Sequence, residues 1–176
     1  MIDPYHHKHA GAEEISWSRL GDLLKALAEK IYREWQPDVV VGIAKGGVVP
    51  GVFLSSAFMV DFYPIKLSSR HDETIISEQP VWHVHPTAVV KDRKVLLVDD
   101  ICVAGRTIRM ASEEIRALGA AEIRTAVIAI HGESVQPDYV GMVSDGLIIW
   151  PWDRNMLTND GEWKMNPEYS EALEKR

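Results

Sequence analysis

The chain has 176 residues, of which 46% are hydrophobic and 26% charged, so length and composition predict one globular domain with a sizeable core. Its 26 acidic and 19 basic residues give a net charge of −7, which argues against a surface that binds nucleic acid or an anionic membrane. The single cysteine excludes an internal disulfide, and neither a signal-peptide pattern nor a long apolar run is seen, so we expect a cytoplasmic protein.

Hydrophobic periodicity predicts alternating helices and strands along one domain spanning 1–176. A flexible N-terminus (1–12) precedes a helix over Ser16–Trp35, where apolar residues recur with the helical period. The next predicted elements are a strand at 39–43, a helix at 48–59, strands at 62–67 and 94–98, a helix at 106–118, strands at 123–130 and 147–150, and a terminal helix at 167–175. This alternation predicts an α/β fold in which a parallel twisted sheet is flanked by helices.

The most informative segment is Lys94–Thr107, where an apolar strand ends in two acids and is followed by a small-residue loop before a helix. Ligands of open α/β sheets bind at the carboxyl ends of strands, where Asp99 and Asp100 lie. The residues whose backbone N–H groups could turn toward a phosphate are Val103, Ala104, Gly105, Arg106 and Thr107. The acids could hold sugar hydroxyls, directly or through Mg²⁺, which indicates a sugar phosphate. The alternative is an acid pair that merely caps the helix.

A second loop with anion-binding character follows the strand at 39–43. Lys45, Gly46 and Gly47 could offer consecutive amides and one positive charge to a pyrophosphate, because glycines allow a close approach of the backbone. By itself, a Lys-Gly-Gly turn after a strand is more often only a tight turn.

The segment Lys94–Thr107 resembles the signature for phosphoribosyl pyrophosphate (PRPP) of the type I phosphoribosyltransferases. In that family an apolar run and two acids are followed, about seven residues later, by glycine and Ser or Thr, which matches Asp99-Asp100 through Gly105-Arg106-Thr107. The loop at 45–47 resembles the pyrophosphate loop of the xanthine-guanine branch. The similarity extends to 15–17, 66–70 and 150–153, and so covers most of the chain.

The resemblance implies two further parts of a site. A mobile flap at about 68–88 would close over PRPP, with Ser69 and Arg70 near the pyrophosphate, although a solvated loop explains these residues equally well. A small C-terminal hood at about 131–166 would bind the base. The residues that the resemblance assigns to base binding are His131, Leu147, Ile148, Trp150 and Asp153.

Two residues depart from the 6-oxopurine pattern. Val103 stands where those enzymes usually have an aspartate near the base, and a valine cannot handle a proton there. His131 stands where they carry a lysine that donates to the exocyclic oxygen, and it could either donate or simply pack at the strand end.

The resemblance implies a cytoplasmic enzyme of purine salvage that transfers phosphoribose from PRPP to a nucleobase, foremost a 6-oxopurine, and releases pyrophosphate. Asp99 and Asp100 would be catalytic and would place Mg²⁺, and the protein would be a homodimer or homotetramer. The alternatives are a regulator that binds PRPP or nucleotides without turnover, which Val103 favours, and an α/β nucleotide-binding domain of another family.

Overall fold

The computed structural model of the chain describes residues 11–68, 70–71, 74–75, 80–131 and 136–169. The helices are α1 (Trp17–Glu34), α2 (Val48–Phe58) and α3 (Arg106–Ala117), with a 3-10 helix η1 (Ala88–Val90). The strands of the main sheet are β2 (Val39–Ile43), β3 (Asp61–Ser68), β6 (Val81–Val84), β7 (Lys94–Cys102), β8 (Glu122–Ile130) and β9 (Tyr139–Val143). The other strands are β1 (Ala12–Glu14), β4 (Arg70–His71), β5 (Thr74–Ile75), β10 (Leu147–Ile149), β11 (Asn155–Leu157) and β12 (Trp163–Met165).

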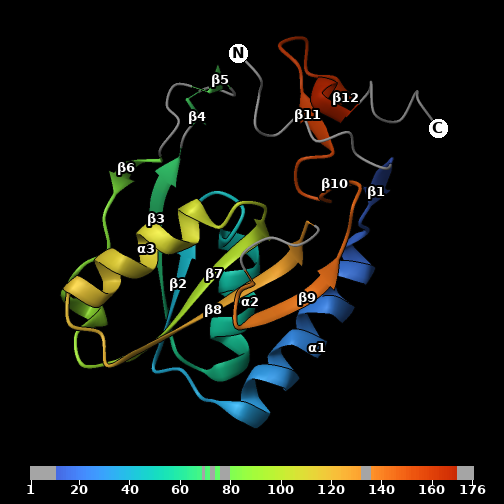
Figure 1. Cartoon of the computed structure of the whole chain (residues 1–176). Helices are drawn as coiled ribbons and strands as arrows, with labels where there is room; N and C mark the ends of the chain where they lie inside the picture. The colour runs from blue at the N-terminus through green and yellow to red at the C-terminus, as the bar shows by residue number, and fades with distance from the viewer. Residues whose placement is uncertain (1–10, 69, 72–73, 76–79, 132–135, 170–176) are drawn as a thin grey trace.

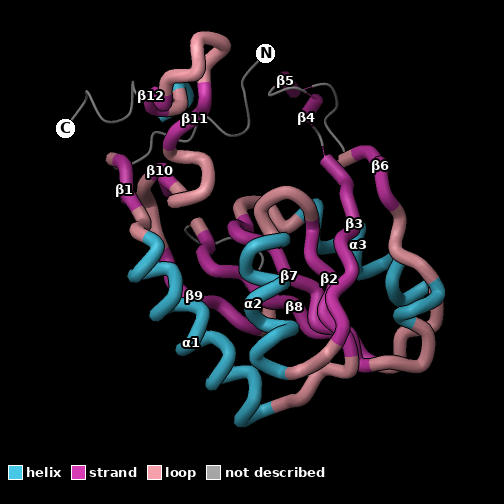
Figure 2. Tube along the Cα trace, turned by 180° about the vertical axis from the view of Figure 1, so that it is seen from behind, coloured by secondary structure: helices cyan, strands magenta, loops and turns pink. Residues whose placement is uncertain are grey.

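The main sheet has the strand order β6-β3-β2-β7-β8-β9. Its strands pair in parallel except β6, which runs antiparallel to β3 at one edge. Figures 1 and 2 show α3 on one face of this sheet and α1 and α2 on the other. The predicted α/β fold, with a mostly parallel sheet flanked by helices, is confirmed.

The sheet is buried on both faces because apolar side chains alternate between two layers of core. All five residues of β2 are buried. On the α3 face, Val41 and Leu97 pack with Ile115, whereas on the opposite face Leu96 packs with Leu27 of α1 and Leu54 of α2. A central strand of this kind reads as a continuous apolar run, which is why β2 and β7 were predictable.

The first helix follows directly from its sequence. Ser16 caps α1 by accepting a hydrogen bond from the Arg19 backbone N–H at 3.2 Å. Leu20, Leu24 and Ile31 lie on its buried face at helical spacing. The helix thus matches the predicted 16–35 segment to within a residue at each end.

Several short strands were not predicted. β9 extends the main sheet, although Gly141 interrupts its apolar run; a Cβ there would lie 2.7 Å from the Ile128 carbonyl oxygen, so close packing against β8 requires glycine. β6 and the β11–β12 hairpin lie in segments without hydrophobic period. Ala12, assigned to the flexible N-terminus, instead belongs to β1 and pairs with Leu147 of β10. Strands this short owe their existence to pairing partners far away in sequence.

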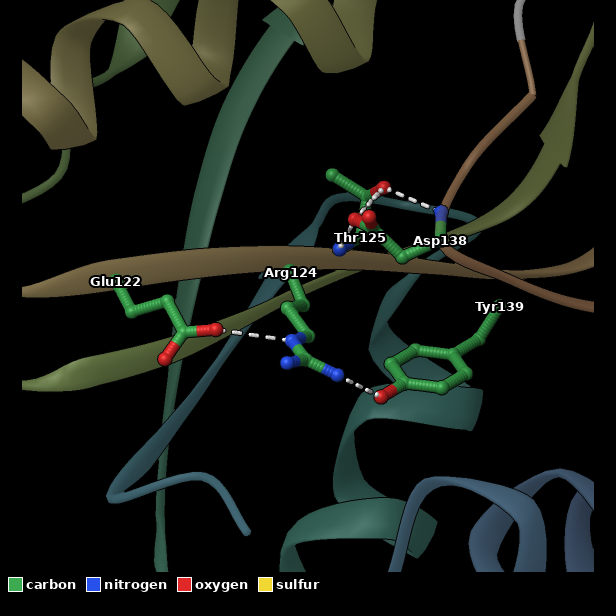
Figure 3. Close-up of polar contacts among 5 residues, drawn as sticks. All are labelled: Glu122, Arg124, Thr125, Asp138 and Tyr139. Carbon is green, nitrogen blue, oxygen red and sulfur yellow. Dashed lines mark hydrogen bonds and ion pairs between the residues drawn. The ribbon is translucent and has the colours of Figure 1, made fainter. Parts of the chain in front are cut away.

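A polar network fastens the amino ends of β8 and β9, away from the acids of β7 (Figure 3). The Arg124 guanidinium donates to Glu122 at 2.9 Å and to the Tyr139 hydroxyl at 2.7 Å. The Thr125 hydroxyl and backbone N–H both donate to the Asp138 carboxylate, at 2.8 and 2.7 Å.

Within the described part of the chain, none of the helices has the length and apolar character needed to cross a bilayer.

Candidate functional site

Asp99 and Asp100 lie near the carboxyl end of β7, as predicted, and both are half-buried. The Asp100 backbone N–H donates to Oδ1 of Asp99 at 3.0 Å, and the Ile101 backbone N–H donates to Oδ1 of Asp100 at 2.7 Å. These bonds fix the orientation of the two carboxyl groups. Each keeps its second oxygen as a possible ligand atom.

Burial disfavours the charged form of both acids. The pKa of Asp99 is raised well above its usual range by burial and, next, by the negative charge of Asp100. Burial raises the pKa of Asp100 to about 6. A bound cation, or hydrogen-bond donors of a ligand, would stabilise the ionised form of two adjacent carboxylates that are costly to ionise.

A cavity adjoins the acids. A cavity of about 180 Å³ is lined by the ten consecutive residues 99–108. Gly105 has φ +68°, a left-handed conformation that favours glycine, and it precedes the first turn of α3. No side chain caps this helix, and its first intrahelical bond to Gly105 comes from Arg109. The amides at 106–108 therefore have no partner within the helix and suit an anion.

The loop between β2 and α2 packs directly onto the acids. A Cβ at Gly46 would lie 2.2 Å from Cγ of Asp100, so only glycine allows this contact. Likewise, a Cβ at Gly47 would lie 2.3 Å from the Val98 carbonyl oxygen. Lys45 is exposed, and its peptide bond with Ala44 is cis. The structure thus brings the two loops that the sequence singled out to one place.

Asp153 from the C-terminal segment completes this charged cluster. Its negative charge contributes to the raised pKa of Asp100, and the positive charge of Lys45 lowers the pKa of Asp153 itself, although burial, the largest effect, raises it. Oδ1 of Asp153 is buried and has no hydrogen-bond partner among the described residues. Asp153 was predicted as a base-binding residue; in the structure its charge acts on the pKa of Asp100.

Tyr169 is a residue of this cluster that the sequence analysis missed. Its side chain is only 7% exposed, and burial together with the negative charge of Asp153 raises the pKa of its hydroxyl. It lay in a predicted terminal helix without any motif. The one available signal was a tyrosine in an otherwise polar segment, which is too common to be informative.

The other residues predicted to bind the base lie in different environments. His131 is next to the signature loop, since its backbone N–H donates to the Cys102 carbonyl at 3.2 Å and its Nδ1 lies 2.6 Å from the Ser144 carbonyl oxygen. A carbonyl can only accept, so Nδ1 carries the proton. Ile148 and Trp150 are each 4% exposed and belong to the core. Leu147 is half-buried and packs against the small cluster that includes Tyr169.

Trp150 stacks on Trp152, with ring centroids 5.0 Å apart and planes within 10°. One face of the Trp150 ring is therefore already covered. Trp152 is half-buried, and its ring centroid lies 6.4 Å from that of Trp17. It is therefore the more accessible of the two stacked side chains.

The predicted flap is described only in part. Ser69 lies outside the described residues. Arg70 belongs to β4, which pairs antiparallel with β5, so that Arg70 is opposite Ile75. Figure 1 shows β4 and β5 beyond the carboxyl end of β3.

The acids suit a hard cation such as Mg²⁺, although the protein supplies few ligands. Among the described residues, no group of three or more His, Cys, Asp and Glu side chains could hold a metal. Mg²⁺ is commonly held by one or two carboxylates, with substrate phosphates and water completing its shell. Asp99 and Asp100 fit that role because burial leaves their charge poorly compensated.

Comparisons with known proteins agree with this geometry. The phosphoribosyl transferase domain family matches residues 16–156. The bifunctional protein PyrR of Ralstonia nicotianae is 30% identical over 137 residues, covering 74% of this chain and 77% of that protein. The adenine phosphoribosyltransferase of Sodalis glossinidius is 28% identical over 137 residues, covering 72% and 74%. The crystal structure of a purine phosphoribosyltransferase from Pyrococcus horikoshii Ot3 superposes with a TM-score of 0.72 and 34% identity, covering 80% of this chain and 93% of that one.

Proposed function

The chain belongs to the phosphoribosyltransferase family, and from this premise we propose that it transfers the 5-phosphoribosyl group of PRPP to a nucleobase, with release of pyrophosphate. We further propose that the preferred base is a 6-oxopurine (hypoxanthine, guanine or xanthine), as in purine salvage. The observation that carries the proposal is the contact of Gly46 with Asp100, because it brings the loop at 45–47 against the acid pair from which the loop at 103–107 continues.

Each part of the site has a distinct role in this proposal. The amides of residues 104–107 hold the 5′-phosphate at the amino end of α3. Asp99 and Asp100 hold the ribose hydroxyls, and the loop at 45–47 binds the pyrophosphate. Transfer then needs mainly positioning and charge stabilisation as the bond at ribose C1 lengthens.

Mg²⁺ bound with PRPP would neutralise the departing pyrophosphate. The residues of this chain that would hold it are Asp99 and Asp100, each through the oxygen that receives no backbone hydrogen bond. Lys45 would add a second positive charge on the pyrophosphate side. These residues would hold the pyrophosphate and the ribose in a fixed position relative to each other.

The preference for a purine rests on similarity and on position. The structure from Pyrococcus horikoshii that is 34% identical to this chain is named as a purine enzyme. His131 lies beside the signature loop, in the place of the lysine of 6-oxopurine enzymes. A 6-oxo group requires a hydrogen-bond donor, and a protonated histidine is a donor at both ring nitrogens.

One observation favours a second candidate, a regulator that binds PRPP or a nucleotide without turnover. Val103 lines the cavity beside the acids and offers no group that could handle the proton of a base.

Pyrophosphate release from Mg-PRPP separates the candidates when it is measured with hypoxanthine, guanine, xanthine, adenine, uracil and orotate. The proposal expects release with a 6-oxopurine and its loss in the Asp100→Asn variant. Binding of Mg-PRPP by calorimetry without release for any base would support the regulator instead. Absence of PRPP binding would refute the transferase and a regulator that binds PRPP.

A further inference from the structure

A second cavity, with a volume of about 240 Å³, lies between α3, β8 and the segment that leads into β9. The connection from β8 to β9 spans only residues 131–138, which is shorter than the crossover of about a dozen residues, usually with a helix, that joins most parallel strands. Its described end, Gln136 and Pro137, lines the cavity together with Thr125 of β8. Among the described residues, α3 is the only α-helix on this face of the main sheet (Figures 1 and 2), so no second helix fills the space beside it.

The wall that α3 contributes to this cavity is polar. Arg109, Ser112, Glu113 and Arg116 are spaced by three, four and seven residues from the first, so they share one side of the helix. The side chains of Arg109 and Arg116 are exposed and form no ion pair or hydrogen bond in the part of the chain that the structure describes. The half-buried Ser112 hydroxyl has no hydrogen-bond partner there either. The polar side of a surface helix is usually only solvated, but here it lines a cavity with two unpaired cations.

The charges and donors of the cavity favour an anion. Two arginines and one glutamate line it, so its net charge is positive in a chain whose net charge is −7. The Thr125 hydroxyl already donates to Asp138 at 2.8 Å (Figure 3), which leaves the arginines, Ser112 and Gln136 as side-chain donors. Guanidinium groups bind phosphate oxygens through pairs of N–H groups. The two arginines lie about 10 Å apart along the helix axis, so two linked phosphate groups can each meet one guanidinium.

The second cavity shares a wall with the cavity beside the acids. Cys102, Gly105 and Ile108 line both cavities, whereas the two acids line only the first. Gly105 is the left-handed residue at which the loop at 103–107 turns into α3. A ligand in the second cavity would therefore touch residues that shape this loop, without occupying the space beside the acids.

We propose that the second cavity binds a diphosphate group, with Arg109 and Arg116 each on one phosphate and with Ser112 and Gln136 donating to the remaining oxygens. Free pyrophosphate and a nucleoside diphosphate both present this group. The volume is below the roughly 300 Å³ at which pockets for whole small molecules begin, so an attached nucleoside would lie outside the cavity. Because the two cavities share a wall, an occupant of the second should change PRPP affinity at the first.

Calorimetry with pyrophosphate tests the site, with Mg²⁺ in excess and with saturating Mg-PRPP to fill the cavity beside the acids. The wild type should still bind one pyrophosphate per chain. The double variant Arg109→Ala/Arg116→Ala should bind it at least tenfold more weakly, the usual effect of losing hydrogen bonds between charged groups. GDP in place of pyrophosphate distinguishes the two sources, since tighter binding of GDP identifies a nucleotide as the ligand and equal or weaker binding identifies free pyrophosphate.

The matched control is the double variant Lys25→Ala/Arg33→Ala. It also removes two exposed cations, but from α1, on the opposite face of the sheet (Figure 1). Equal pyrophosphate binding by the two double variants would overturn the site, as would a wild type whose pyrophosphate binding disappears once PRPP is saturating.

The effect on PRPP is measured as its Kd in the wild type and in Arg109→Ala/Arg116→Ala. Without pyrophosphate the two values should agree, because neither arginine lines the cavity beside the acids. With pyrophosphate present they should differ, since competition beside the acids is the same in both proteins; equal values would overturn the coupling of the two cavities. A wild type that binds no PRPP would overturn the proposed function alone, because pyrophosphate binding that depends on the two arginines would still support the second site.

Discussion

Replacing Asp100 by asparagine should stabilise the folded protein and remove most of its PRPP turnover. The Asn side chain has nearly the same shape, and its oxygen can still accept the hydrogen bond from the Ile101 backbone N–H, at 2.7 Å in the structure. What changes is the charge. Because burial raises the pKa of Asp100 from 3.8 to about 6, the native state pays to hold the ionised carboxylate at neutral pH.

The magnitude follows from this pKa difference. The difference between the ordinary pKa of 3.8 and the pKa of about 6 in the folded protein sets an upper limit of about 3 kcal/mol, at roughly 1.4 kcal/mol for each tenfold change in proton affinity. Below the ordinary pKa both states are protonated and the penalty is absent; as the pH rises through about 4 to 6, the unfolded state ionises first and stability falls. Asp100→Asn should therefore raise the free energy of unfolding by about 1 to 3 kcal/mol at neutral pH, with a gain that shrinks toward zero near pH 4.

The assay is urea or thermal unfolding of both proteins across this pH range. At neutral pH the melting temperature of Asp100→Asn should rise by about 2–4 °C per kcal/mol for a chain of this size. PRPP turnover should fall by about a hundredfold or more, because Asp100 is proposed to act on the reacting ribose. Asp92→Asn is the control, since Asp92 is exposed and has a φ of +57°, which asparagine tolerates. Two results would refute the conclusion that the folded protein raises the pKa of Asp100. One is a lower free energy of unfolding for Asp100→Asn at neutral pH, and the other is a stabilisation that does not depend on pH.

Three further substitutions test the loops and the base site. Gly46→Ala should lose Mg-PRPP binding in calorimetry and destabilise the fold by about 1–3 kcal/mol, because its Cβ would overlap Asp100. Gly21→Ala in α1 is the control, since a Cβ there would meet no atom within 4 Å and should leave binding unchanged. Equal effects of the two substitutions would contradict the contact of Gly46 with Asp100. Lys45→Ala should weaken PRPP binding about tenfold, more at low ionic strength, and an effect independent of salt would argue against a direct charge role. His131→Lys should raise the ratio of hypoxanthine to adenine turnover, because an ammonium group only donates; an unchanged ratio would remove His131 from base recognition.

The layered α/β fold, and the place of the small-residue loop that follows the acid pair, could be predicted from the sequence. The reason is local: runs such as 39–43 and 95–98 can be buried only inside a sheet covered on both faces, and the acids at 99–100 and the glycine at 105 follow within a few residues of one strand. The helical period of α1 and its Ser16 cap are equally local. Features encoded within one continuous segment need no knowledge of distant neighbours.

Which of the separate candidate residues meet could not be predicted from the sequence. The close approach of Gly46 to Asp100 depends on the pairing of β2 with β7, which are more than fifty residues apart in sequence. The sequence assigned Ile148 and Trp150 to base binding, yet the packing of α1 and β10 against the sheet buries both side chains in the core. Tyr169 is buried against Ala12 and Ile149, which come from the two paired strands β1 and β10. Such juxtapositions arise from burial that is shared between distant segments, and therefore no single segment encodes them.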